Sequence, residues 1–490
     1  MARGVGSQVR PLAGMCAWLV PFGIYCASLN RSVGYWDTGE AQVVPWILGI
    51  AHPTGFPVYT LFGWLFSHAA PIGSVAMRLA LFSALAMSLT AWLIFRIVHE
   101  LGDDLAIAVT SAWLFAFGFV AWTRGTRAEV HALAVLFAVL TVFCMQRWYR
   151  RGDRRFFIVG AGAWGLGIAT HPIVALMLPG VLLVLAARLR RTDAKMLAIA
   201  SLVFVSALGC YAYLPIRSAV VFAQRRDPTL ALGVPPGRPF WDNNHPSTWQ
   251  GFAQQVSGSE FGTAGVLSAL FSARTYAVSG PDYLRTLARE LTPPGALLAL
   301  AGLIVMLRRD PWLASALAVG VSIPTAFGLA YSLEADQQRY YMFSFAVAAV
   351  LAGYAAAAAA RAEPSLRVTV VAAMAVLAGA LVVGNRDTFA QRNSSGAEAV
   401  IASVLTHTPA NAILIAPWLY AAPLAYGAYV EHSLGNRIVE TAWLVDDAAR
   451  VPRWAQRRPV FVVGIIFGSV PGYHVVPVGG APSIFEVVKN

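Results

Sequence analysis

Three ionisable side chains stand close together at residues 35–57, which read YWDTGEAQVVPWILGIAHPTGFP. They are Asp37, Glu40 and His52. A carboxylate or an imidazole can accept a proton from a reacting hydroxyl or return one, so this combination is typical of a catalytic site. We therefore predict Asp37, Glu40 and His52 as catalytic residues.

The same residues also fit purely structural roles. The spacing of Asp37 and Glu40 matches a capping box, with Asp37 at the N-cap of a helix and Glu40 reaching back to it. His52 and His171 each precede a proline, and a residue before proline is disfavoured in the α region, so both could mark helix ends. The structural and catalytic roles can coexist, because a capping carboxylate can still face a cleft.

Further ionisable side chains lie in later polar stretches of the chain. Arginine can hold a phosphate through two parallel hydrogen bonds, although Arg127 and Arg217 also suit anchors at the membrane surface. Arg124, Glu334 and Asp336 lie in the same stretches. We predict as substrate-binding residues Arg127, Glu129, His131, His171, Arg217, Asp242 and Arg339.

The elements that position these residues must be membrane helices. The 490 residues are 58% hydrophobic and only 12% charged, whereas soluble domains carry about 25% charged residues. Apolar runs of roughly 17–25 residues, long enough to cross a bilayer, recur along the chain. We predict an all-α polytopic membrane protein. The four cysteines lie singly within apolar segments, which favours a packing role.

The net charge of +12 comes from Lys and Arg in short loops between apolar runs. This pattern orients a membrane protein and does not indicate a nucleic-acid partner. It predicts a cytoplasmic N-terminus and an extracytoplasmic C-terminus. We expect the membrane to be the inner membrane of a bacterium. We expect about eleven spans: 11–29, 75–98, 105–122, 130–147, one ending at 170, one starting after 172, and 196–214, 294–307, 312–331, 341–360 and 367–384.

These spans define a transmembrane catalytic domain over residues 1–384 and place the candidate residues on the outer face. Its first outer loop, 31–74, contains two expected short helices, 38–50 and 57–69, lying at the membrane surface. A long polar loop, 216–292, lies on the same side. Residues 385–490 change in composition and predict a small extracytoplasmic α/β domain. It shows no catalytic motif and no glycine-rich phosphate loop, so we expect it to be accessory.

Several motifs resemble a known family. DTGEA with AHPTGFPVYTLFGWLF is similar to the signature of membrane proteins that include a eukaryotic protein O-mannosyltransferase of plexin-type receptors. The resemblance continues through WTRGTRAEVHAL, GIATHPIVALMLPG, YLPIRS, WDNNHPSTWQGFAQQVSGSEF and DQQRYYMFSF, over roughly residues 12–355. This family looks like part of the GT-C superfamily of multi-span glycosyltransferases, which use polyprenyl-phosphate sugar donors.

The resemblance implies a function and roles for particular residues. It implies an inverting glycosyltransferase that moves a sugar, mannose by family precedent, to an acceptor hydroxyl outside the membrane. The catalytic acidic residue of such enzymes lies in the first outer loop, where Asp37 stands. The acceptor could be a protein, a glycolipid or a glycan, and the bilayer is the other partner. The family's functional residues map onto Asp37, Glu40, His52, Glu129, Arg217 and Arg339.

Two alternatives stay open. Asp37 and Glu40 are oxygen ligands that suit Mg²⁺ or Mn²⁺, but the first loop holds no DxD pair, so we expect no metal or other cofactor. A transporter or flippase of a lipid-linked or anionic substrate is the other function class. It would show inverted repeats and charges near the membrane midplane, whereas we find no convincing repeat and the charges gather at one face.

Overall fold

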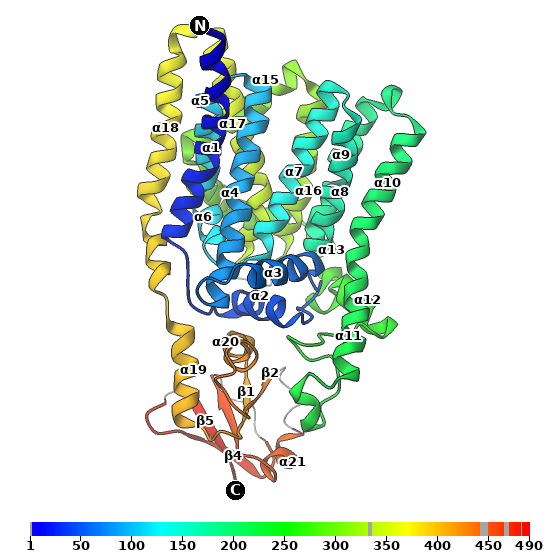
Figure 1. The fold of residues 1–490 in the computed structure, drawn as a ribbon, viewed down its shortest axis with the longest axis vertical. Helices are drawn as coiled ribbons and strands as arrows, with labels where there is room; N and C mark the ends of the chain where they lie inside the picture. Colours follow the sequence, from blue (N-terminus) through cyan, green and yellow to red (C-terminus); the bar gives the residue numbers. More distant parts are fainter. Residues whose placement is uncertain (1, 332–335, 442–448, 465–469, 482) are drawn as a thin grey trace.

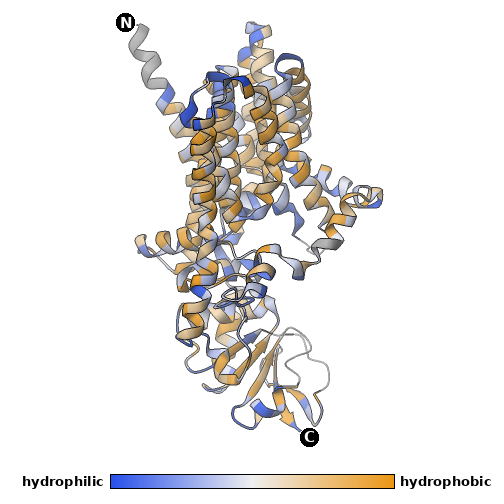
Figure 2. Cartoon of the chain, turned by 90° about the vertical axis from the view of Figure 1, so that its right-hand side faces the viewer, coloured by the Kyte–Doolittle hydropathy of each residue, from blue (hydrophilic) through white to orange (hydrophobic). Residues whose placement is uncertain are grey.

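The structure is a computed structural model that describes residues 2–331, 336–441, 449–464, 470–481 and 483–490. Long helices run side by side along the longest axis, and a small sheet lies at one end of them (Figure 1). Hydrophobic residues predominate along the long helices (Figure 2). The N-terminus and the C-terminus lie at opposite ends of the molecule (Figure 1).

The bundle contains most of the helices. They are α1 (Ala2–Ala27), α4 (Val75–Gly102), α5 (Leu105–Ala116), α6 (Phe119–Gly125), α7 (Val130–Arg151), α8 (Arg154–Thr170), α9 (Leu178–Ala187), α10 (Ala194–Leu208), α11 (Tyr213–Ala223), α15 (Pro293–Arg309), α16 (Pro311–Ala330), α17 (Met342–Ala362) and α18 (Arg367–Gly384).

Seven helices in the described ranges are long and apolar enough to cross a membrane, or up to nine if each of two bent pairs forms one span. The chain is therefore an integral membrane protein. The bent pairs are α5 with α6, at 73°, and residues 273–291 with α15, at 101°. Each of the eleven predicted spans overlaps helical residues, but α8, with 17 residues, and the segment Pro172–Ala187 are not among these seven to nine helices.

Two short helices cross the end of the bundle, α2 (Trp36–Ile47) and α3 (Pro57–Ala69) (Figure 1). They match the short helices predicted in the first outer loop. Proline at the first position favours the start of α3. The chain enters α4 through Ser74, whose hydroxyl accepts a hydrogen bond from the Met77 amide, and this N-cap satisfies one otherwise unpaired donor.

The predicted long polar loop is largely helical. The helix α11 extends the preceding span to Ala223, and three more helices follow: α12 (Trp249–Ser257), α13 (Thr263–Leu270) and α14 (Ala273–Leu291). Exposed apolar side chains such as Trp249 and Phe271 lie in this region, which suits a segment at the membrane surface. The helices α12 and α13 are short and lie on either side of Gly258 and Gly262, and α14, with 19 residues, contains Pro281, so the sequence did not predict them as helices.

The C-terminal module consists of α19 (Gly396–His407), α20 (Trp418–Tyr429), α21 (Val451–Ala455) and five strands among the described residues. The strands are β1 (Ile413–Ala416), β2 (Ile438–Thr441), β3 (Val460–Val463), β4 (Tyr473–Pro477) and β5 (Ile484–Lys489). Their order is β2-β1-β3-β5-β4. β2, β1 and β3 are parallel, and β5 and β4 continue the sheet in antiparallel pairing. The predicted α/β composition of this module is confirmed.

The module packs against the end of the bundle through α20, which lies next to α2 (Figure 1). The three parallel strands are buried along their whole length, as expected for strands covered on both faces. Because α20 follows β1 directly, the carboxyl end of the central parallel strand faces the helices of the first outer loop.

Candidate active site

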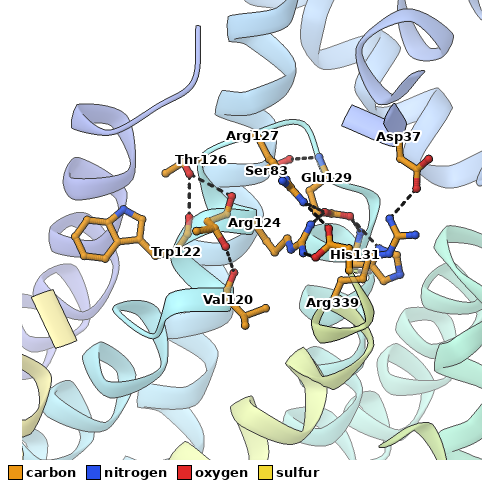
Figure 3. Close-up of polar contacts among 12 residues, drawn as sticks. Asp37, Ser83, Val120, Trp122, Arg124, Thr126, Arg127, Glu129, His131 and Arg339 are labelled. Carbon is orange, nitrogen blue, oxygen red and sulfur yellow. Dashed lines mark hydrogen bonds and ion pairs between the residues drawn. The ribbon is translucent and has the colours of Figure 1, made fainter. Parts of the chain in front are cut away.

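The Asp37 carboxylate lies where three distant segments meet. Its Oδ2 accepts a hydrogen bond from Arg339 Nη1 at 2.7 Å, and its Oδ1 accepts one from Trp418 Nε1 at 3.0 Å. The predicted capping box is wrong: Tyr35 is the N-cap of α2, without a side-chain hydrogen bond, and Asp37 lies inside the first turn. The carboxylate is therefore aimed away from its own helix and toward Arg339 (Figure 3).

Glu40 lies one helical turn after Asp37 and holds His52. Its Oε1 accepts a hydrogen bond from the His52 amide at 2.7 Å, and its Oε2 contacts His52 Nδ1. Glu40 is only 2% exposed, and both of its carboxylate oxygens contact His52. The His52 ring forms edge-to-face pairs with the rings of Phe56 and Trp418. A carboxylate on Nδ1 fixes the orientation of an imidazole and leaves Nε2 available.

The charges around Asp37 shift both titrating groups. Burial raises the pKa of Asp37, but His52, Arg339 and the two hydrogen bonds outweigh it and lower the pKa to about 2. Burial lowers the pKa of His52, but Glu40 and Asp37 outweigh it and raise the pKa to about 9. At neutral pH the site therefore contains an aspartate and an imidazolium.

A second polar cluster begins at Glu129, the N-cap of α7. Its Oε1 lies 2.9 Å from His131 Nδ1, and its Oε2 accepts a hydrogen bond from Arg124 at 3.0 Å. Arg124 and Arg127 both bind the carboxylate of Asp336, Arg127 at 3.0 Å. The predicted Arg127, Glu129 and His131 are thus brought together (Figure 3). Glu334 lies outside the described residues.

Aromatic rings connect the two clusters. The ring centroids of His131 and His171 lie 4.4 Å apart. The rings of His131 and Tyr340 form an edge-to-face pair with 5.1 Å between their centroids. His171 stacks on Phe56, which in turn contacts His52. The predicted residues Asp37, Glu40, His52, Arg127, Glu129, His131, His171 and Arg339 therefore form one continuous region.

An apolar crevice opens beside this region. It lies between α7, residues 172–177, α16 and the start of α17. Arg339 and His131 are among the residues that line it. A second crevice shares Met177 and Phe343 with the first and continues between α7, α9 and α16. The walls of the first crevice are His131, Ala134, Val135, Ala138, Ile173, Val174, Met177, Pro324, Arg339, Tyr340 and Phe343.

Two predicted residues lie in other surroundings. Arg217 donates to the carbonyl oxygens of Leu48 and Ile47, the latter at 3.0 Å, and so binds the C-terminal end of α2, where a positive charge is favourable. Asp242 is buried, and its Oδ2 lies 2.6 Å from His245 Nδ1. Burial raises the pKa of Asp242. The contacts found in the described chain join neither residue directly to Asp37.

Trp418 was missed because the C-terminal module looked ordinary in sequence. The available signal was its position, just after the carboxyl end of a buried strand, where ligands commonly bind in α/β sheets. Arg124 and Asp336 had been noticed as outer charges without a role. Across the described ranges, no group of three or more His, Cys, Asp or Glu side chains could hold a metal ion.

Known proteins resemble parts of this chain in sequence. Residues 37–195 match the family model of the protein O-mannosyl-transferase TMEM260 N-terminal domain. The chain is similar to protein O-mannosyl-transferase TMEM260 of Mus musculus, with 27% identity over 67% of this chain and 47% of that protein. It is also similar to the Dictyostelium discoideum protein of that name, with 26% identity over 49% of this chain and 30% of that protein. The matches thus span half or less of these relatives.

Two crystal structures of ArnT from Cupriavidus metallidurans share the fold. The apo structure aligns with a TM-score of 0.54 over 98% of both chains, and the structure bound to undecaprenyl phosphate with 0.57 over 99% of this chain and 98% of ArnT. Sequence identity is 12% in both cases, so this likeness concerns the fold alone. The chain therefore shares its fold with ArnT, as predicted for a GT-C-like membrane protein, and is similar in sequence to the TMEM260 protein O-mannosyl-transferases.

Proposed function

We propose that the protein is an inverting membrane glycosyltransferase. It moves a sugar from a polyprenyl-phosphate donor to an acceptor hydroxyl on the extracytoplasmic side of the membrane. The observation that carries this proposal is the Asp37 carboxylate held between Arg339 and Trp418, where Arg339 also lines an apolar crevice. The names of the TMEM260 relatives favour mannose as the sugar and a protein as the acceptor.

The crevice suits the lipid part of such a donor. Its walls are mostly aliphatic and aromatic, and its polar members are His131, Arg339 and the Tyr340 hydroxyl. A polyprenyl chain would lie among the apolar side chains, while Arg339 would bind the phosphate through its guanidinium fork. The ArnT structure with undecaprenyl phosphate supports a lipid phosphate as a ligand of this fold.

Arg339 would then exchange one anion for another. In the structure it binds Asp37, and a carboxylate with a pKa of about 2 is a weak base. When Arg339 turns to the donor phosphate, Asp37 loses a positive neighbour and its pKa rises toward the working pH. Donor binding would therefore activate the base. His52, as an imidazolium, would stabilise the negative charge of the leaving phosphate.

The chemical step follows from these positions. The acceptor oxygen attacks the anomeric carbon while Asp37 takes its proton, so a new carbon–oxygen bond forms. The bond between the anomeric carbon and the phosphate oxygen breaks, and the lipid phosphate leaves from the opposite face with both electrons. A single displacement of this kind inverts the anomeric configuration.

The other predicted residues have positioning roles in this proposal. Glu40 orients His52, and Glu129 gathers His131 and Arg124. Arg217 fixes the end of α2, the helix that carries Asp37. For Asp242 we propose a role in ordering the outer loop through His245, with at most an indirect effect on the substrate.

The charge pattern supports an outward-facing site. The basic stretch at residues 147–155 lies at the end of α7 opposite Glu129, and hence at the end of the bundle far from Asp37. Basic loops favour the cytoplasmic side, so we place the N-terminus there and the C-terminal module outside. The inner membrane of a bacterium stays our proposed location, and membrane fractionation of the native host tests it.

The experiment that tests this function uses the purified full chain in lipid nanodiscs. A panel of polyprenyl-phosphate sugars is offered together with acceptor peptides, glycolipids and glycans. We expect one donor to be consumed, with a product of inverted anomeric configuration. In proteoliposomes, movement of an intact donor across the bilayer without cleavage would contradict the proposal and favour a flippase.

A further inference from the structure

The C-terminal module is fixed tightly to the helix that carries Asp37. Gly39 of α2 has no room for a side chain: a Cβ there would stand 2.5 Å from the Gly34 carbonyl oxygen and 2.9 Å from the Ala422 Cβ of α20. The Tyr426 hydroxyl accepts a hydrogen bond from the Ala76 amide at 3.1 Å. α20 is therefore held against both α2 and the start of α4, and the position of Trp418 is set by these contacts.

The indole of Trp418 is also held in place by the ring of Phe240 from the long outer loop. Its ring stacks on Phe240 with 5.2 Å between centroids and 3° between planes. The Phe240 carbonyl accepts a hydrogen bond from the Ile50 amide at 3.1 Å, which ties the long outer loop to the first one. Phe240 is 2% exposed. The indole N–H thus points at Asp37 from a fixed support.

Among the described residues, both oxygens of the Asp37 carboxylate accept a hydrogen bond, and the two donors come from different parts of the chain. Arg339 donates a hydrogen bond to Oδ2, and Trp418 donates one to Oδ1. The charged groups that face Asp37 are Arg339 and His52, with Glu40 behind His52. If Arg339 binds the donor phosphate, Trp418 is the partner that keeps the carboxylate in place.

We propose that Trp418 is a positioning residue for Asp37, and that the C-terminal module is in this way a part of the catalytic centre and no accessory. This inference rests on the proposed transferase function. An aimed hydrogen bond to a catalytic carboxylate fixes the lone pair that takes the proton. Loss of that bond lets the carboxylate rotate, which lowers the rate of the chemical step and leaves donor binding nearly unchanged.

Three variants of the full chain separate the hydrogen bond from simple packing. Trp418→Phe keeps an aromatic ring on Phe240 and removes the N–H donor. Trp418→Gln removes the ring but places an amide N–H donor at a similar reach. Tyr420→Phe, on the same helix, keeps Trp418 and tests the general effect of altering the interface, where Tyr420 faces Tyr35.

We measure kcat, the KM for the donor and the pH dependence of kcat/KM, with thermal unfolding in detergent as a check of the fold. Trp418→Phe should lower kcat about tenfold or more, the scale of a hydrogen bond to a charged group. Its KM should change little, and the acidic limb of the profile should move to higher pH, because Asp37 loses a donor that favours its ionised form. Trp418→Gln should retain more kcat than Trp418→Phe, and Tyr420→Phe should match the wild type.

A Trp418→Phe variant with wild-type kcat and an unmoved acidic limb would overturn the inference. Higher activity in Trp418→Phe than in Trp418→Gln would also overturn it, because packing would then be the main contribution of Trp418. Failure of the transferase proposal is distinguishable, since the wild type itself would then transfer no sugar from any donor of the panel.

Discussion

Arg339 Nη1 lies 2.7 Å from Asp37 Oδ2, although 302 positions separate the two residues in the sequence. Arg339 is only 8% exposed. Water therefore has little access to its guanidinium and cannot easily take the place of this carboxylate. The pair keeps Asp37 ionised and weakly basic until another anion takes its place. The same contact joins the first outer loop to the start of α17, and both are therefore needed to form the site.

Replacing Arg339 should chiefly weaken donor binding. Arg339→Lys keeps a positive charge but loses the planar fork that fits a phosphate. We expect the KM for the polyprenyl-phosphate sugar to rise about tenfold or more, with a smaller change in kcat. Steady-state kinetics at varied donor concentration measure this. Arg285→Lys, at an exposed arginine of α14, is the matched control; equal effects of both variants would count against a phosphate role for Arg339.

The ion pair of Glu40 and His52 predicts a pH-dependent stability. The folded-state pKa of His52, about 9, lies above its ordinary value of 6.5, so the folded protein binds this proton more tightly than the unfolded chain. The resulting stabilisation is complete below pH 6.5 and is lost as the pH rises through 9. The melting temperature in detergent should therefore fall between pH 7 and pH 10.

Glu40→Gln should flatten this fall, because Glu40 is the largest influence that raises the pKa of His52. Glu398→Gln, at an exposed carboxylate of α19, should leave it as in the wild type. Identical slopes in Glu40→Gln and the wild type would show that His52 does not carry the effect.

Removing the charge of Glu129 should destabilise the site. Glu129 and Arg124 are 6% and 4% exposed, and a buried charge that loses a partner is costly. Glu129→Gln should lower the free energy of unfolding by about 1–3 kcal/mol and reduce transfer through the displaced His131. Thermal unfolding and initial rates are the measurements. Unchanged stability with lost activity would instead indicate a direct chemical role.

The reaction should not need a divalent metal ion. The oxygens of Asp37 are engaged by Arg339 and Trp418, and those of Glu40 by His52, so neither carboxylate is arranged as an open oxygen ligand set. We expect initial rates of transfer in EDTA to equal those in added Mg²⁺ or Mn²⁺. Loss of activity in EDTA and its recovery with Mn²⁺ would contradict this.

The sequence predicted the architecture well where periodicity and composition decide it. Long apolar runs have one stable form in a bilayer, so every predicted span fell on a helix. Positive-inside charge bias also assigned Asp37, Glu129 and Arg339 to one face, and the structure brings these three residues into one region. Local rules were less reliable: the capping box failed because α2 starts two residues earlier than expected, at Trp36, with Tyr35 in place of Asp37 as the N-cap.

The remaining parts of the site depend on contacts that no local pattern encodes. Trp418 reaches Asp37 across 381 positions, and its role depends on how α20 packs on Gly39. Arg217 looked suited to bind phosphate, but the carbonyl oxygens at the end of α2 occupy it. In both cases the hydrogen-bond partner was fixed only by tertiary packing.

The most direct test of the central claim is transfer by Asp37→Asn in nanodiscs, measured under single-turnover conditions with the donor identified from the panel. The variant keeps the size of the side chain and loses the base, so we expect the rate of sugar transfer to fall about a hundredfold to ten-thousandfold. Asp282→Asn, at an exposed carboxylate of α14, should retain the wild-type rate. Wild-type transfer by Asp37→Asn would contradict the account.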